Sequence, residues 1–344
     1  MNLTLYKQGI KKVLKYNSFE KLKNKSILIL GANGLIGSGI IDVLAYLNSE
    51  LNYNIKIICS VRNKNKILER FNSYNNLKIV EQDLLKDFTI TEKVDYVINA
   101  ASNAHPLAFS TDPVGTISAN FIGTKNILEY CKSNKVKRML FISSGEIYGQ
   151  GSDDIKAFKE DYSGKINSTD FRSCYPIGKL AAESLCASYL EEYGVKTVIA
   201  RLCHTYGPTQ QENDSRASQQ FIKNVLNDKD IVLKSPGVQV RSYCYVLDSV
   251  TGILRILLDG KSGEAYNVAN NASILSIREF AETVAATKNR KVIFDIPSES
   301  EKRGYNKVTR SVLDGTKLEK LGWKPIYGYK DGIKETIGVL ENVK

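Results

Sequence analysis

The chain has 344 residues, of which 42% are hydrophobic and 25% are charged, the composition of an ordinary globular protein large enough for two coupled domains. Its formal net charge of +11 at pH 7 comes from scattered lysines rather than from a basic stripe with interleaved aromatics. We therefore expect no nucleic-acid partner, while a mild positive field would suit a phosphate-bearing small substrate or simply reflect a lysine-rich surface. Residues 1–25 hold no apolar run long enough for a signal peptide or a membrane span. We expect an N-terminal helical extension there, no membrane association and a cytoplasmic location.

Strand and helix patterns alternate over the first two hundred residues, which is typical of a parallel sheet wrapped by helices. Short apolar runs predict strands at 26–30, 55–61, 77–81, 94–99, 137–143 and 195–201. Apolar residues at helical spacing predict a helix after the first strand, a long helix at 113–132 and another at 175–193, the last preceded by a polar loop at 149–172.

After residue 201 the pattern loosens. The sequence predicts a turn-rich stretch at 204–217, helices at 219–226 and 248–258, a strand at 264–269 and short mixed elements beyond. The predicted fold is α/β, a Rossmann-type doubly wound parallel sheet with a smaller mixed α/β substrate-capping domain. We expect the dinucleotide-binding domain at 26–202, also receiving about 240–270, and the interwoven cap at 203–344.

Cysteine and histidine usage bears on redox and metal chemistry. The six cysteines form no C-x-x-C pair and mostly fall in apolar runs, so we expect reduced core residues in a cytosolic protein. Only His105 and His204 occur, which argues against a histidine-based metal site, and we predict no metal.

A glycine-rich turn, Gly31-Ala32-Asn33-Gly34-Leu35-Ile36-Gly37, follows the first strand directly and opens a helix. In this context Gly31 permits the tight turn, Gly34 lets the backbone approach a pyrophosphate, and Gly37 allows close packing of helix on strand. The anion would then lie at the positive helix N-terminus. The predicted dinucleotide contacts in this turn are Gly31, Asn33, Gly34, Leu35, Ile36 and Gly37.

The end of the second strand bears on which dinucleotide binds. NAD-binding proteins usually place a carboxylate there for the adenosine ribose, whereas this chain has Arg62. A guanidinium could hold a 2′-phosphate in a two-point contact, so Arg62 favours NADP(H), although it could equally be a surface arginine beside NAD. Asp83, just after the third strand with Leu84 beside it, is a candidate to accept from the adenine amine. The cofactor is therefore predicted as NAD(P).

Tyr175 and Lys179 lie four residues apart at the start of a predicted helix, and this spacing puts both side chains on one helix face. A free tyrosine keeps its proton up to about pH 10. A neighbouring lysine cation, helped by an oxidised nicotinamide ring, would favour the phenolate and lower that pKa. Taken alone, the pair could be an ordinary surface contact, but with the glycine turn upstream it indicates hydride chemistry on an alcohol or ketone.

Further stretches match a known pattern: Asn99-Ala100-Ala101-Ser102, Asn120 with Gly123-Thr124, Ser143 to Gly149, Arg201 to Pro208, and Arg241-Ser242-Tyr243. With the glycine turn and the Tyr175/Lys179 pair, they make nearly the whole chain from residue 26 onward resemble the extended short-chain dehydrogenase/reductase family. Within that family it resembles the nucleotide-sugar epimerases, dehydratases and decarboxylases, and its pattern is most similar to UDP-glucuronate decarboxylase-like enzymes.

The resemblance implies a nucleotide-diphosphate sugar as substrate. Tyr175 would be the base, Lys179 would bind the nicotinamide ribose and tune the tyrosine, and Ser144 would hydrogen-bond the reacting hydroxyl. Hydride removal at sugar carbon 4 would give a 4-keto intermediate. Relatives commonly pair their helices at 113–132 and 175–193 across a two-fold axis, so a homodimer is expected. Further expected contacts are Ala100 and Ala101 for the cofactor, and Ser102 and His105 for the substrate, with a structural role for His105 left open.

Glu146 would decide the fate of that ketone. Dehydratases of the family carry Thr-Asp-Glu where this chain has Ser144-Gly145-Glu146, so the aspartate that protonates the leaving hydroxyl is missing. UDP-glucuronate decarboxylases carry Thr-Ser-Glu there and keep the glutamate. The alternative is that Glu146 is a polar residue at a strand end with no chemical role.

Arg241 and His204 are the remaining substrate candidates. In related enzymes the arginine meets the substrate diphosphate or a carboxylate, either of which suits a planar guanidinium, while a structural ion pair is the alternative. His204 stands where the family commonly has asparagine. Its imidazole could donate to a phosphate or hydroxyl and titrate near neutrality, or it could simply pack in a loop.

The predicted function is therefore a nucleotide-sugar enzyme of decarboxylase, epimerase or dehydratase type with internal cofactor recycling, in a setting of polysaccharide biosynthesis. Glu146 favours this cycle. Arg62 favours the alternative, an NADPH-dependent reductase of 4-keto-6-deoxyhexose nucleotides. A remoter alternative is a non-catalytic cofactor-binding scaffold, although such proteins typically lose the Tyr or the Lys, and both are present here.

Overall fold

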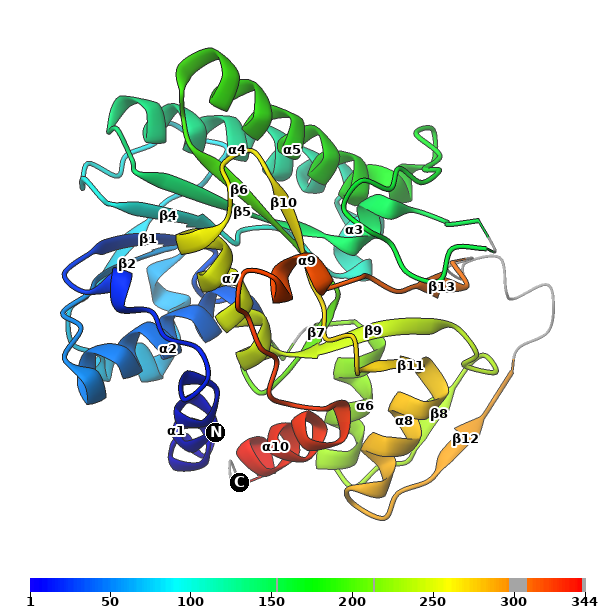
Figure 1. Cartoon of the computed structure of the whole chain (residues 1–344). Coiled ribbons are helices and arrows are strands. Elements are labelled where there is room, and N and C mark those ends of the chain that lie inside the picture. Colours follow the sequence, from blue (N-terminus) through cyan, green and yellow to red (C-terminus); the bar gives the residue numbers. More distant parts are fainter. Residues whose placement is uncertain (153, 213, 297–307, 342–344) are drawn as a thin grey trace.

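A seven-stranded parallel sheet forms the centre of the molecule, which is a computed structural model that describes residues 1–152, 154–212, 214–296 and 308–341 (Figure 1). Its strand order is β10-β6-β5-β4-β1-β2-β3. The order reverses between β1 and β4, and in such sheets ligands bind outside the carboxyl ends of the strands at that point. The strands are β1 Ser26–Leu30, β2 Lys56–Val61, β3 Leu77–Glu81, β4 Tyr96–Asn99, β5 Arg138–Ser144, β6 Thr197–Leu202 and β10 Ala265–Val268.

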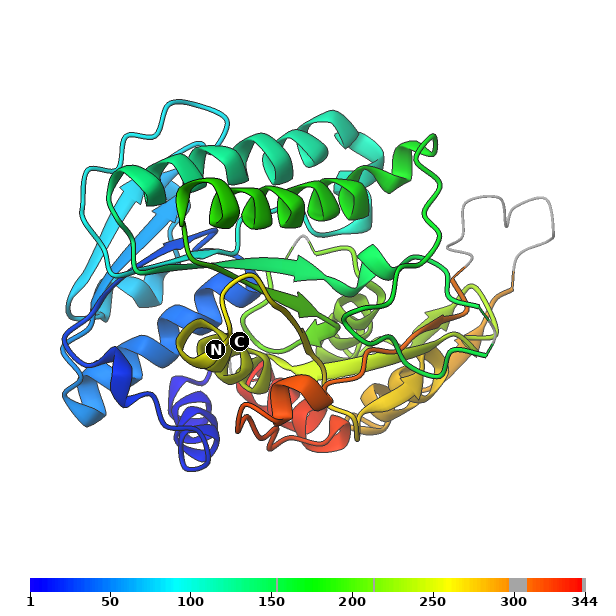
Figure 2. The same cartoon turned by 45° about the horizontal axis from the view of Figure 1, so that its top comes forward.

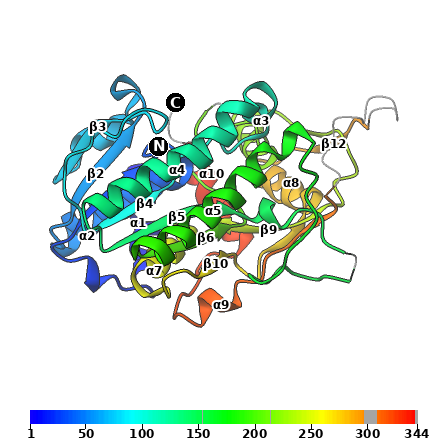
Figure 3. The same ribbon diagram turned by 90° about the horizontal axis from the view of Figure 1, so that it is seen from above.

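Helices cover both faces of this sheet. They are α2 Leu35–Leu51 and α7 Val246–Asp259 on one face, and α4 Pro113–Ser133 and α5 Cys174–Tyr193 on the other. Strand alternation explains the two layers: Ile27 and Ile29 pack into the core shared with α2 and α7, whereas Leu28 and Leu30 pack into the core beneath α4 and α5. Helices α4 and α5 lie side by side along their lengths (Figures 2 and 3).

A smaller mixed layer lies beyond the carboxyl edge of the main sheet. Its central strand is β9, which pairs with β7 and β13 in parallel and with β11 antiparallel, while β8 and β12 form a separate parallel pair. Strands β7 and β9 carry His204 and Arg241 to this edge. The elements here are β7 His204–Tyr206, α6 Ala217–Leu226, β8 Ile231–Leu233, β9 Val240–Tyr245, β11 Ile274–Ser276, α8 Ile277–Ala286, β12 Val292–Phe294, β13 Arg310–Ser311, α9 Thr316–Glu319 and α10 Tyr329–Glu341.

The N-terminal helix α1, Leu3–Leu14, lies against α2, α7 and α10. The amide of Asn2 donates to the carbonyl of Val339 at 2.7 Å, so this helix is tied to the C-terminal one. In the described part of the chain, no helix combines the length and the apolar character needed to cross a bilayer.

The predicted strands of the main sheet are present, with ends that differ by one or two residues from the expected ones. The helices α4, α5, α6 and α7 also agree with the sequence. The turn-rich stretch at 204–217 contains one short strand, β7, that the sequence did not predict, and the C-terminal part holds the helices α8 and α10 beside its short elements. Helix α3, Pro106–Thr111, was not predicted either.

Candidate active site

The glycine turn joins β1 to α2 with a geometry that only glycine allows. Gly31 has a φ of +80°, and a Cβ on Gly37 would lie 2.2 Å from the carbonyl oxygen of Gly31. Gly34 is the N-cap of α2 and brings no side chain over the first helical amides. The open helix N-terminus therefore fits a dinucleotide pyrophosphate, which the amides of Leu35 and Ile36 would meet.

A cavity of about 370 Å³ opens beside this turn, at the carboxyl edge of the sheet. It brings together residues from the turn, β5, α5, β7 and β9, and Gly34 and Arg241 among them are 207 positions apart in sequence. The predicted site residues that line it are Gly34, Leu35, Ile36, Ala100, Ser102, His105, Ser144, Glu146, Tyr175, Lys179, His204 and Arg241.

The remaining predicted cofactor contacts lie outside the lining of this cavity. Arg62 is exposed at the end of β2. Asp83 accepts a hydrogen bond from the Leu85 amide at 3.0 Å within its own turn. Leu84 is buried and packs on Gly123 of α4, so its side chain belongs to the core beneath that helix. The others are Gly31, Asn33 and Gly37 in the turn, and Ala101 after β4.

Tyr175 and Lys179 occupy the first two turns of α5 and both are buried. Tyr175 shares the cavity wall with Ser144 at the end of β5, and Ser144 acts to lower the pKa of the phenol. On its other side the Tyr175 ring stacks on Phe109 of α3, with ring centres 4.6 Å apart. The Lys179 ammonium donates to the carbonyl of Ile142 at 2.8 Å and lies 5.7 Å from the centre of the Tyr175 ring.

The pKa of Tyr175 departs from the sequence prediction. Burial and the charge of Glu146 raise it above its ordinary value, while the hydrogen bond from Ser144 and the charge of Arg216 lower it. The protein groups alone do not produce the expected lowering of the Tyr175 pKa by Lys179. Burial lowers the pKa of Lys179 itself to about 7. A lysine that is only partly charged near neutrality is a weak electrostatic partner for the phenol.

Glu146 starts the short turn after β5, where its amide donates to the Ser144 hydroxyl at 3.2 Å. Its side chain is exposed in the wall of the cavity. Partial desolvation by the surrounding protein nevertheless raises its carboxyl pKa. The positive charges of Arg216, Arg241 and Arg172 act in the opposite direction. A carboxyl group thus faces a cationic end of the cavity.

Arg216 was missed from the sequence. It lies in the turn-rich stretch before α6 and lines the cavity, with its Nε donating to both carboxylate oxygens of Asp214 at 3.0 Å. The only signal was the Asp214-Ser215-Arg216 triplet itself, which no local pattern distinguishes from an ordinary polar loop.

Arg241 is 5% exposed and donates to the carbonyls of Val240 and Val308 at 3.0 and 2.7 Å. Its main-chain bonds fix the guanidinium at the cavity wall, and burial lowers its pKa. Both His204 and Arg241 therefore reach the cavity, as the sequence predicted.

The two histidines have different surroundings. Burial, with Arg241 and Arg216 nearby, lowers the pKa of His204 to about 3. Three effects thus disfavour the His204 cation, which argues against the option that this imidazole titrates near neutrality. His105 is the N-cap of α3, where its Nδ1 accepts from the Ala108 amide at 3.4 Å, so it has a structural role as well as a place in the cavity lining.

All six cysteines are buried free thiols: Cys59, Cys131, Cys174, Cys186, Cys203 and Cys244. Over the residues that the structure describes, no group of three or more His, Cys, Asp or Glu side chains is placed to hold a metal ion.

Comparisons with known proteins agree with this architecture. The family model described as "NAD dependent epimerase/dehydratase family" matches residues 27–269. UDP-glucuronic acid decarboxylase 5 of Arabidopsis thaliana is 32% identical over 314 residues, which is 90% of this chain and 87% of that protein. UDP-glucose 4-epimerase of Thermotoga maritima, solved with UDP-glucose, superposes with a TM-score of 0.78 at 23% identity, over 91% of this chain and 98% of the other. UDP-glucose 4-epimerase of Thermus thermophilus, solved with NAD, gives a TM-score of 0.77 at 25% identity, over 93% of this chain and all of the other (100%). The chain belongs to the NAD-dependent epimerase/dehydratase family.

Proposed function

We propose that the protein is an enzyme that oxidises a nucleotide sugar at carbon 4 and uses the resulting ketone for a second step. Family membership, the glycine turn and the buried Tyr175–Ser144 pair beside one cavity support this proposal. NAD(P), when bound, would accept the hydride and return it later in the same turnover.

In this proposal the chain's own groups move one proton and hold one hydroxyl. Ser144 would bond the carbon 4 hydroxyl and pass its proton to Tyr175, which lines the same cavity. Lys179 reaches the same cavity from the next turn of α5, where it would bind the nicotinamide ribose. The raised pKa of Tyr175 means that the phenolate needs help from the positive nicotinamide ring before it can act as a base.

Glu146 and its arginine neighbours favour decarboxylation of a UDP-glucuronate-type substrate as the second step. A sugar that carries both a diphosphate and a carboxylate needs several cationic partners, and Arg216 and Arg241 line the cavity opposite Glu146. The ketone at carbon 4 would accept the electron pair of the carbon 5–carboxylate bond as an enolate while carbon dioxide leaves. Glu146 would then donate a proton to carbon 5, which restores the ketone for the returning hydride. The single observation that carries this choice is the placement of Glu146 among these arginines.

The experiment is product analysis with the purified protein, NAD and UDP-glucuronate. Decarboxylation converts the substrate to a product lighter by one carbon dioxide, with a pentose spectrum in NMR. UDP-glucose and dTDP-glucose serve as matched substrates without the carboxylate. Epimerisation or dehydration of those two, with UDP-glucuronate left untouched, would overturn the choice of substrate.

A reductase is the second candidate, and Arg62 favours it. Arg62 is exposed at the end of β2, where a 2′-phosphate of NADP(H) would lie. Under this alternative the protein would consume NADPH stoichiometrically with a 4-keto-6-deoxyhexose nucleotide and would form no pentose.

We further propose a homodimer built on α4 and α5. Their outer surface exposes large apolar side chains, among them Val114 at 74% and Ile122 at 44% exposure. Replacing Ile122 by Glu should give a monomer in light scattering where the unchanged chain gives a dimer.

The proposed domain division is a dinucleotide-binding part at 26–202, with about 240–270, and a cap at 203–344. In this division the cavity would lie between the two parts. The free thiols support a reducing, cytoplasmic location, in which nucleotide sugars feed polysaccharide synthesis.

A further inference from the structure

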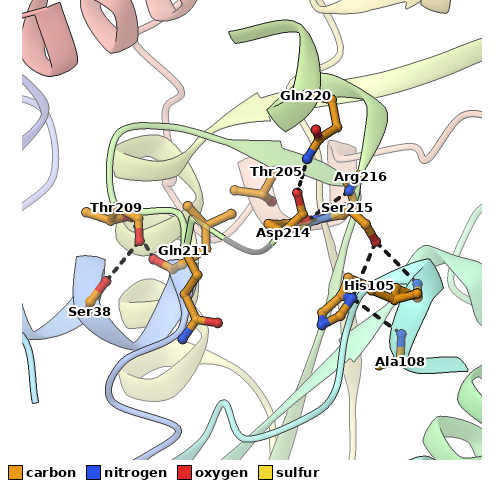
Figure 4. Close-up of polar contacts among 12 residues, drawn as sticks. Ser38, His105, Ala108, Thr205, Thr209, Gln211, Asp214, Ser215, Arg216 and Gln220 are labelled. Carbon is orange, nitrogen blue, oxygen red and sulfur yellow. Dashed lines mark hydrogen bonds and ion pairs between the residues drawn. The ribbon is translucent and has the colours of Figure 1, made fainter. Parts of the chain in front are cut away.

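The stretch between β7 and α6 touches the glycine turn at its first end. The Thr209 hydroxyl donates to the carbonyl of Leu35 at 2.9 Å, and the Ser38 hydroxyl donates to the carbonyl of Thr209 at 3.4 Å (Figure 4). Two residues on, the Gln211 amide group donates to the carbonyl of Asn33 at 3.1 Å. Residues more than 170 positions downstream thus bind carbonyls of the turn, whose residues Gly34, Leu35 and Ile36 line the cavity.

The same stretch reaches the substrate side of the cavity at its second end. Asp214 and Ser215 hold this end, and Arg216, paired with Asp214, lines the cavity. The Ser215 hydroxyl accepts from the Leu107 amide at 3.2 Å and lies 3.4 Å from Nδ1 of His105, at the start of α3 (Figure 4). Gln220 of α6 donates to the carbonyl of Asp214 and fixes its backbone.

The first end is therefore fixed to the dinucleotide turn and the second to a substrate-facing arginine. Thr209 is 4% exposed and Asp214 is 7% exposed, so both ends are packed rather than loosely laid on the surface. The amide of Asp214 donates to the carbonyl of Gln211 at 3.2 Å, so a direct hydrogen bond joins the two ends.

We propose that Thr209 and Gln211 are positioning residues that couple dinucleotide binding to nucleotide-sugar binding through Asp214 and Arg216. A dinucleotide bound at the glycine turn would hold Gln211 in place and, through Asp214, hold Arg216 in place. In the other direction, a nucleotide sugar bound by Arg216 would strengthen the contacts of Thr209 and Gln211 with the turn. By linkage, each ligand raises the affinity of the other by the same factor. The inference rests on the proposed function in one respect, namely that a nucleotide sugar occupies the Arg216 side. Such coupling would keep the cofactor bound while the 4-keto sugar is present, which internal recycling requires.

The test measures binding without turnover. NADH fluorescence is titrated with and without saturating UDP-glucuronate, a pair that cannot react because the cofactor is already reduced. The unchanged protein should bind NADH at least about fivefold more tightly with UDP-glucuronate present. Gln211→Ala and Thr209→Val should bring this ratio close to one. Gln150→Ala removes a comparable donor, since that amide bonds the carbonyl of Gly151 outside the cavity, and should keep the full ratio.

The outcomes separate this inference from the proposed function. Calorimetry of UDP-glucuronate alone shows whether the sugar binds. If it binds and the NADH ratio of the unchanged protein is one, or if Gln211→Ala keeps the full ratio, the coupling is overturned while the proposed substrate stands. If UDP-glucuronate does not bind, the proposed substrate is wrong, and the same titration with UDP decides the coupling by the same criterion. Gln211 is exposed, so its variant remains informative even if Thr209→Val fails to fold.

Discussion

The ammonium of Lys179 donates a hydrogen bond to the carbonyl of Ile142 at 2.8 Å, which joins the first turns of α5 to the end of β5. Lys179 is 2% exposed, and burial lowers its pKa to about 7. This hydrogen bond holds α5 against β5. Burying the charged form of the same ammonium costs free energy, which is why its pKa is lowered.

Lys179→Met should change how stability depends on pH. In the unfolded chain Lys179 keeps its proton up to about pH 10.5, whereas the folded chain releases it from about pH 7 upward. The unfolded state therefore binds more protons in this window, and stability of the unchanged protein rises with pH through it. Methionine does not titrate. The free energy of unfolding of the unchanged protein should therefore rise relative to that of the variant by a few kcal/mol across this window, at about 1.4 kcal/mol per pKa unit. Urea unfolding at both ends of the window measures the change. Lys261→Met, at an exposed side chain, is the control and should show a constant difference.

Tyr175→Phe should remove the proton acceptor and leave the fold in place, because the ring still stacks on Phe109. General acid–base groups contribute about 10²–10⁴-fold to a rate, and we expect a loss of that size in sugar-dependent reduction of bound NAD. Absorbance of the reduced nicotinamide follows the step. Tyr193→Phe changes an exposed tyrosine at the other end of α5 and should keep the rate. An unchanged rate for Tyr175→Phe would support the non-catalytic scaffold.

Glu146→Gln should stop the chemistry at carbon 5 and spare the hydride step, since Ser144 and Tyr175 remain in contact. The expected result is loss of deuterium uptake at carbon 5 from heavy water, followed by NMR. Because desolvation raises the carboxyl pKa of Glu146, its proton-donating form should persist to a higher pH than in a free glutamate, and the rate of carbon 5 protonation should fall as the pH rises past that pKa. Glu192→Gln, on the exposed side of α5, is the control. Normal carbon 5 exchange in Glu146→Gln would make Glu146 structural.

Arg62→Ala should discriminate between the two dinucleotides. If the guanidinium holds a 2′-phosphate, the variant loses about tenfold or more in affinity for NADPH and keeps its affinity for NADH. Fluorescence titration with both cofactors gives the ratio, and Lys86→Ala, at an exposed residue after β3, should leave it unchanged. Equal effects on both dinucleotides would return Arg62 to the role of a surface residue beside NAD.

Local patterns were sufficient for the main sheet and the cofactor turn. The strand at 26–30, the glycines at 31, 34 and 37, and the helix that follows are all encoded in one continuous stretch, residues 26–51. The sequence could not predict β7, because a three-residue strand exists only through its pairing with β9. Arg216 escaped for the same reason, since its importance comes from the fold that brings a polar loop to the cavity.

The charge states of buried groups could not be predicted from the sequence either. The Tyr175/Lys179 spacing predicted their common helix face correctly, but the prediction of a lowered tyrosine pKa ignored burial, which raises it. His204 fails in the same way, because two arginines from distant segments and desolvation together keep it neutral. Burial is a property of the folded chain, and spacing alone does not reveal it.

The central claim is that hydride leaves carbon 4 and returns to it within one turnover. The direct measurement uses UDP-glucuronate with deuterium at carbon 4, the purified protein and unlabelled NAD, with NMR of the product. We expect a decarboxylated pentose that retains deuterium at carbon 4. A pentose with hydrogen at carbon 4 and deuterium in free NADH, or no pentose at all alongside steady NADPH consumption with a 4-keto sugar nucleotide, would contradict it.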